Sequence, residues 1–192
     1  AKALDNVAMR DFLYRDRNDL SVYAKAMFGL ALHRVGDFAK RDMLIQNCDQ
    51  FLVEDNENQS AWLKLPPDNY WWCWYGSEME AHAFYLKLIA AKYEQLSAKG
   101  QKLDAEQQAD ARKLLDRASR LVKYLINNRK HASYWNSTRD TAYVIEAFAD
   151  YLKASGEDAP DMTVKVSLDG KLVKEVKIDK SNIFSFDNKF VL

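Results

Sequence analysis

Glu78 and His82 are the residues best spaced for chemistry in this chain, because a helix would place them one turn apart on the same face. Such a pair can bind a metal ion or relay a proton. Only two candidate ligands are local, however, and no cysteine or histidine cluster accompanies them. We therefore expect His82 to be a hydrogen-bonded structural histidine. His33 and His131 stand at expected helix ends, where a cation suits the carbonyl dipoles.

Asp140 and Glu146 are a second pair to consider, since two carboxylates can act as general acid and base. Asp140 follows Ser137 by three residues, and this spacing predicts a capping box in which Asp140 reaches back to the backbone of Ser137. Glu146 faces the surface of the same helix, so we expect neither carboxylate to be catalytic. The adjacent Arg139 either contacts a partner or pairs with a neighbouring carboxylate.

The two cysteines, Cys48 and Cys73, are too few for a disulfide framework, and their spacing does not make a metal site. We expect two free thiols. No catalytic residue, metal or other cofactor is expected in this chain.

Three alanine-rich helices would have to position these side chains: Asp19 to Val35, Ser77 to Tyr93 and Ser137 to Leu152. Each begins with a capping residue, Asp19 in the first case, and they recur about sixty residues apart, which suggests a repeated helical hairpin. In the last helix the residues expected to face inward are Thr141, Val144, Ile145, Phe148, Tyr151 and Leu152.

More polar helices should alternate with these three: Leu4 to Arg15, one capped by Asp37, and Asp104 to Lys130. For the helix after Asp37 we expect Phe38, Met43, Leu44, Cys48, Phe51 and Leu52 inward, and Lys40, Arg41, Gln46, Asp49 and Gln50 outward. For the helix after Asp104 we expect a buried stripe of Leu114, Leu115, Ala118, Leu121, Val122, Leu125 and Ile126, and a solvated face of Asp110, Arg112, Lys113, Asp116, Arg117 and Lys123.

Two segments break the helical period. Between Asp55 and Gly76 a polar run, an extended Ala61 to Leu65 and an aromatic Tyr70 to Tyr75 suggest an insertion that pairs two short strands. After Pro160 apolar residues alternate with period two on both sides of Asp169-Gly170, which predicts a β-hairpin, and a third strand is expected near Ile183, with Phe184 and Phe186. We divide the chain into a helical domain, residues 1–158, and the start of a β domain, residues 159–192.

Bulk composition excludes some partners. With 28 basic and 28 acidic residues the chain has no net charge to attract nucleic acid, and it has no apolar run long enough to span a membrane. The hydrophobic content of 48% is typical of a folded core. Because the sequence begins without an initiator Met and inside a helical pattern, we expect it to be a piece of a longer parent protein.

Several of these motifs resemble one family. The run Trp135 to Ala142, the alanine-rich helix after it and Leu125 to Arg129 before it look like the last hairpin of the thioester-containing domain of alpha-2-macroglobulin and complement proteins. Glu78 to Ala83 resembles the start of the preceding inner helix. Trp71 to Gly76 is closer to the bacterial members. The resemblance covers about residues 19 to 179.

This resemblance implies a mainly α fold, a partial α/α toroid of helical hairpins, followed by a small antiparallel β element of a CUB-like or other β domain. It also implies a parent that inhibits endopeptidases by trapping them, outside the cell or in the periplasm. The family's Cys-x-Glu-Gln thioester motif is absent here, because Cys48 and Cys73 are each followed by other residues. Expected partners are the parent's other domains and, through the parent, proteases.

The tryptophans leave two alternatives open. Together Trp62, Trp71, Trp72, Trp74 and Trp135 would suit a sugar or isoprenoid pocket, since α/α toroids also house enzymes that act on carbohydrates and isoprenoids. The favoured interpretation is that aromatic rings cap the end of the toroid and contact a neighbouring domain or ligand. The contact residues expected are Trp71, Trp72, Trp74, Tyr134 and Trp135. A pure protein-interaction module built on the tryptophan loop is the third possibility.

Overall fold

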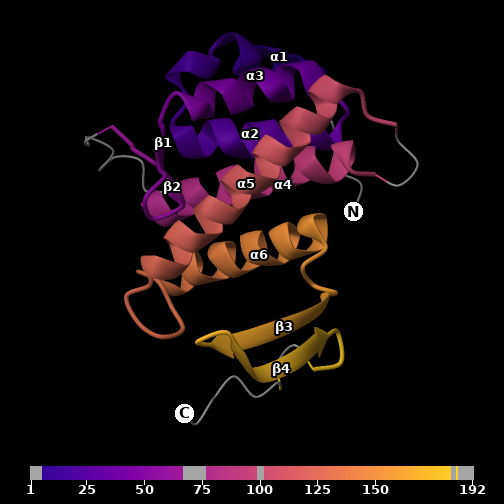
Figure 1. Ribbon diagram of the computed structural model, residues 1–192. Helices are drawn as coiled ribbons and strands as arrows, with labels where there is room; N and C mark the ends of the chain where they lie inside the picture. The colour runs from indigo at the N-terminus through magenta and orange to yellow at the C-terminus, as the bar shows by residue number, and fades with distance from the viewer. Residues whose placement is uncertain (1–5, 67–76, 99–101, 183–184, 186–192) are drawn as a thin grey trace. The chain divides into compact units, whose positions relative to one another are not determined.

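The computed structural model describes residues 6–66, 77–98, 102–182 and 185 (Figure 1). These residues form six α-helices and two antiparallel two-stranded sheets. A mainly helical fold with a small antiparallel β element is thereby confirmed. The chain divides into two compact units, Ala1–Ala154 and Ser155–Leu192, which are described separately here.

The first helices begin at short polar caps. In α1, Val7–Arg15, Asn6 caps the N-terminus, and α3, Phe38–Asp49, begins at Asp37 as predicted. The helix α2, Val22–Arg34, begins later than predicted: Ser21 accepts a hydrogen bond from the Ala24 amide at 3.2 Å, and Asp19 belongs to a preceding 3-10 turn. Ser21 is the cap because its hydroxyl accepts from the amide three residues further along, which is the usual capping geometry, whereas Asp19 belongs to the turn before the helix.

The centre of the helical unit is α4, Glu78–Leu96, in which eleven of nineteen residues are buried. Both α2, which precedes it in the chain, and α5, which follows it, pack against it. The contact with α2 is close at Gly29, where an added Cβ would lie 2.6 Å from Leu88 Cδ2. A helix buried to this extent must be covered on several sides, and the small residues Ala81, Ala83 and Ala90 allow that approach.

The last two helices are α5, Ala105–Asn127, and α6, Thr138–Ser155. A capping box of Asp104 and Gln107 starts α5. The hydroxyl of Ser137 accepts from the Asp140 amide at the start of α6, which confirms that half of the capping prediction. On α6 the buried apolar residues are Val144, Ala147 and Tyr151.

Some residues on these helices do not face the way the apolar pattern predicted. Ile145 is 54% exposed, Leu152 39% and Ile126 of α5 40%. On α3, Phe38 and Met43 are also exposed, whereas Arg41 is 2% exposed. The reason is that each helix buries only the stripe covered by its neighbours, and apolar residues beside that stripe remain at the surface.

The three alanine-rich helices lie side by side, with α4 between α2 and α6. Tyr23 of α2 and Tyr143 of α6 both place their rings against Phe84 of α4, at centroid distances of 5.1 and 5.0 Å. Lys87 of α4 also pairs with Glu146 of α6 at 2.8 Å. The neighbouring order of these helices follows the repeat seen in the sequence, and the toroid itself stays a prediction.

A short hairpin follows α3: β1, Leu52–Asp55, pairs with β2, Ser60–Leu63. The extended conformation predicted for Ala61 to Leu63 is confirmed. The prediction for its partner strand is wrong, because Leu52 was expected in the preceding helix and lies in β1 instead. The residues from Tyr70 to Tyr75, on which the predicted pairing also depended, all lie outside the described residues.

The second unit contains one hairpin, with β3, Asp161–Leu168, paired to β4, Lys171–Asp179. Its turn is at Asp169 and Gly170, whose φ values of 49° and 78° are both positive, as a two-residue turn of this kind requires. The predicted turn and both strands are confirmed. The third strand expected from Ile183 falls on residues that, apart from Ser185, lie outside the described part of the chain.

In the described ranges no helix combines the length and apolar character needed to cross a membrane.

Candidate functional site

Of the aromatic residues expected to contact a partner, the structure describes Tyr134 and Trp135, and it places them differently. Trp71, Trp72 and Trp74 lie outside the described residues. Tyr134 is 45% exposed and stacks on His131 at 4.1 Å. Trp135, its neighbour in sequence, is 4% exposed and donates from Nε1 to the carbonyl of Leu125 at 2.8 Å. Its indole therefore belongs to the core of the helical unit.

The N-terminal ends of α4 and α6 are joined by buried polar contacts. The hydroxyl of Ser77 donates to Asp140 Oδ1 at 2.5 Å, while Asp140 is 3% exposed. Arg139 Nε lies 2.7 Å from Glu80 Oε1, so the expected pairing of Arg139 with a carboxylate is confirmed. Asp140 was expected to serve only its own helix, but it also holds the cap of α4. This contact between helices leaves no signal in the local sequence pattern.

Burial shifts the pKa of one carboxyl group in this cluster. Glu80 is 3% exposed, and desolvation raises the pKa of its carboxyl above the usual range, with the nearby Arg139 acting in the opposite direction. Asp140 adds a further negative charge that also raises it. The positive charge of Arg139 favours the ionised form of the buried Glu80 carboxyl group. The contacts of Arg139 and Asp140 with α4 link the two helix ends.

His82 is a buried structural histidine, as predicted. Its Nε2 accepts from the Leu63 amide at 2.8 Å, so the ring proton is on Nδ1 and is donated to the Glu78 carbonyl at 2.7 Å. Burial lowers the pKa of the imidazole, which keeps it neutral. The ring thereby joins α4 to β2. Among the described residues no group of three or more His, Cys, Asp or Glu side chains is placed to hold a metal ion.

Cys48 is a free thiol with no exposed surface, and burial raises its pKa to about 12. A thiol with so high a pKa is protonated at neutral pH and is a poor nucleophile. Cys73 lies outside the described residues.

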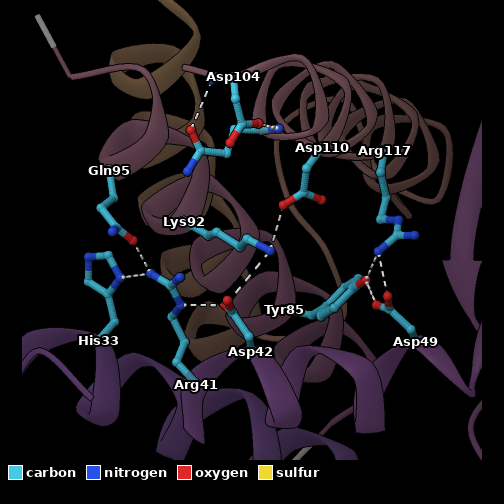
Figure 2. Close-up of polar contacts among 11 residues, drawn as sticks. His33, Arg41, Asp42, Asp49, Tyr85, Lys92, Gln95, Asp104, Asp110 and Arg117 are labelled. Carbon is cyan, nitrogen blue, oxygen red and sulfur yellow. Dashed lines mark hydrogen bonds and ion pairs between the residues drawn. The ribbon is translucent and has the colours of Figure 1, made fainter. Parts of the chain in front are cut away.

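A group of polar side chains lies between α3, α4 and α5 (Figure 2). It lines a groove of ≈ 250 Å³ that also contains Gln46 and Lys113. In its middle Lys92 of α4 lies 2.8 Å from Asp110 of α5 and 3.8 Å from Asp42 of α3. One ammonium group thus connects three helices.

The second contact in this groove centres on Asp49. Its carboxylate lies 2.8 Å from Arg117 Nη1 and also accepts from the hydroxyl of Tyr85 (Figure 2). Tyr85 has no exposed surface, and desolvation raises the pKa of its phenol well above the ordinary value. Arg117 Nε finds no hydrogen-bond partner among the described residues, although Glu54 Oε1 lies 3.9 Å away.

The third contact is made by Arg41 of α3. Its Nη1 donates to Gln95 Oε1 at 2.5 Å and to His33 Nδ1 at 2.9 Å, and its Nε pairs with Asp42 at 2.8 Å. Burial, and then the charge of Arg41, lower the pKa of His33. His33 is therefore held neutral at the end of α2, where the sequence favoured a cation.

Arg41 and Arg117 were both predicted to face solvent, and both predictions are wrong. Their sequence positions contain a usable signal, because Arg117 lies three residues after Leu114 and Arg41 three before Leu44, on the buried stripes of their helices. A charge at a stripe position indicates a buried ion pair. Its partner, however, comes from another helix.

Each carboxylate in the groove is paired with a cation from a neighbouring helix, Asp42 and Asp110 with Lys92 and Asp49 with Arg117, so the arrangement holds helices together. In comparisons with family models, curated proteins and solved structures, nothing matches this chain.

Proposed function

We propose that this chain is the C-terminal part of the α/α toroid of a bacterial alpha-2-macroglobulin-like protein, and that it serves as a structural scaffold in protease trapping. The observation that carries the proposal is the order of the alanine-rich helices, in which α4 is covered by α2 and α6. Helical repeats that wrap into a ring need inner helices of this kind, small enough on several faces for close packing.

Two further features support this role. The Trp135 to Ala142 run, on which the resemblance depends, includes the residues that cap α6 and link it to α4. A β-hairpin follows the last helix, where the family has its returning β domain. Both fit a segment placed between a helical ring and the next domain of a parent that acts in the periplasm or outside the cell.

A scaffold role suits the chemistry of the groove. Its carboxylates are engaged with cations from other helices, and each such contact crosses between two or three helices. Buried ion pairs add little net stability compared with apolar packing, but they specify which helix faces which, because a mismatched helix would leave a charge unpaired. A domain that must keep its shape while its parent rearranges benefits from such specificity.

The test uses the full-length parent and a panel of endopeptidases. A trapped protease keeps its activity on small peptide substrates but loses access to protein substrates, so both activities are measured with and without the parent. The proposal expects this split for at least one protease. A matched parent carrying Val144→Asp, which places a charge in the core of α6, should express poorly or fail to trap. The proposal is contradicted if the parent leaves both activities of every protease in the panel unchanged.

A further inference from the structure

The helix α6 is apolar on two sides, and only one of them is buried. Its buried stripe contains Val144, Ala147 and Tyr151, which belong to the core of the helical unit. On a different side of the helix, apolar residues are exposed to solvent, and Ile145 and Leu152 are the large ones, 54% and 39% exposed. These residues recur at steps of three, four and three, so they form one exposed stripe along the helix: Ala142, Ile145, Ala149 and Leu152.

The exposed stripe differs from the outer face of a typical surface helix, which is charged or polar. The helix α5 follows that rule, because its exposed residues include Arg112, Lys113, Asp116 and Lys123.

The charged residues of α6 lie beside the stripe and are engaged with α4. Lys87 of α4 pairs with Glu146 at 2.8 Å and with Asp150 at 3.4 Å, and Glu94 of α4 pairs with Lys153 at 3.2 Å. The four residues of the exposed stripe are all uncharged. A continuous apolar stripe on a helix surface indicates a face that packs against another surface.

The order of large and small residues in the exposed stripe indicates which surface this is. In one direction along the helix the order is small, large, small, large, and in the other direction it is large, small, large, small, with the same spacing. When a second α6 lies antiparallel against the first, each large side chain therefore faces an alanine. Ile145 faces Ala149 of the second copy, and Leu152 faces Ala142 of the second copy. Both pairs are centred on the level of Ala147, so one two-fold axis generates both.

A two-fold interface uses the same surface on both partners, so that surface must be complementary to itself. Alternating large and small residues meet this condition, because the large side chains of each helix fill the spaces above the alanines of the other. We propose that the exposed stripe of α6 binds α6 of a second copy of this chain in antiparallel orientation, independently of the scaffold role. One helix face supplies less than the roughly 800 Å² per partner of a standard interface, so the dimer is weak, with a dissociation constant on the order of 10–100 μM.

The proposal is tested by sedimentation velocity of the whole chain, over a concentration range from about 5 to about 500 μM that brackets this dissociation constant. We expect the sedimentation coefficient to rise with concentration. Ile145→Glu places a carboxylate against an alanine of the second copy and should weaken the dimer about tenfold or more, because that charge loses water without gaining a partner. The matched control is Ile126→Glu, the same substitution at an isoleucine of α5 that is 40% exposed, and it should leave the association unchanged. Circular dichroism checks that every variant keeps the helical fold.

The antiparallel pairing is tested by mixing two variants. Ile145→Glu and Ala149→Lys should each weaken self-association, whereas an equal mixture of the two should associate again, because the new carboxylate of one chain then faces the new ammonium of the other. Parallel packing would place each Ile145 opposite itself, and mixing would restore nothing.

Three results overturn the proposal. The first is a chain that stays monomeric over the whole concentration range. The second is an Ile145→Glu variant whose association is weakened no more than that of Ile126→Glu. The third is a mixture of Ile145→Glu and Ala149→Lys chains that associates no better than its two components.

Discussion

Replacing Arg117 by Met removes the charge that joins α5 to α3 while keeping most of the aliphatic stem that packs in the groove. The variant leaves Asp49 with the hydroxyl of Tyr85 as its remaining described partner, so a carboxylate whose side chain is 30% exposed loses its cation. The free energy of unfolding should therefore fall.

The magnitude follows from burial. Removing one partner of a fully buried ion pair costs about 3–5 kcal/mol, because the other charge is left uncompensated. Asp49 is partly open to water and keeps one hydrogen bond, so we expect a loss of about 2 kcal/mol. For a chain of this size that loss lowers Tm by about 4–8 °C.

Arg120→Met is the matched control, made on the same helix with the same substitution. Arg120 pairs with the exposed Asp116 at 2.7 Å, four residues earlier, and donates to the exposed Asn56 at 3.0 Å. Because both partners are in contact with water, its loss should cost only about 1 kcal/mol. Urea unfolding followed by far-UV circular dichroism measures both variants. Adding Asp49→Asn to Arg117→Met should recover about 1 kcal/mol, because the unpaired charge is then gone. Equal losses in the two single variants, or no recovery in the double variant, refute the reasoning.

Three further predictions concern the core. Burial lowers the pKa of His82, so below about pH 6.5 the unfolded chain binds a proton that the folded chain resists. The free energy of unfolding should therefore fall by up to about 1.4 kcal/mol per pH unit until the folded-state pKa is reached. In His82→Gln the free energy of unfolding, measured with urea, should depend less steeply on pH over this range. Gly29→Ala places a Cβ 2.6 Å from Leu88 and should cost about 1–3 kcal/mol, measured as a lower urea midpoint with an unchanged slope. Ile145→Gln should change stability by less than about 0.5 kcal/mol, whereas Val144→Ala should cost about 1–3 kcal/mol, and comparable thermal shifts would contradict the assigned face of α6.

Local chemistry was readable from the sequence. Ser77, Asp37 and Asp104 each cap the helix expected of them, and Asp169-Gly170 turns the β-hairpin, because a cap or a tight turn depends on a few consecutive residues. The start of α2 was the exception: Asp19 and Ser21 both suit a cap, and the choice between them depends on the turn that precedes the helix.

The side chains that join helices were not readable in the same way. Arg41 and Arg117 appear in sequence as surface charges, and Asp140 as a local cap, yet each is buried against a residue from another helix.

The sequence by itself determined the helical repeat, most of the caps and the change to β structure after Pro160, because hydrophobic period and capping act over one or two turns of chain. Only the tertiary structure decided which face of each helix is buried and which charges pair. The physical reason is that burial and ion pairing depend on distances between segments remote in sequence, and no pattern within one segment encodes its neighbour.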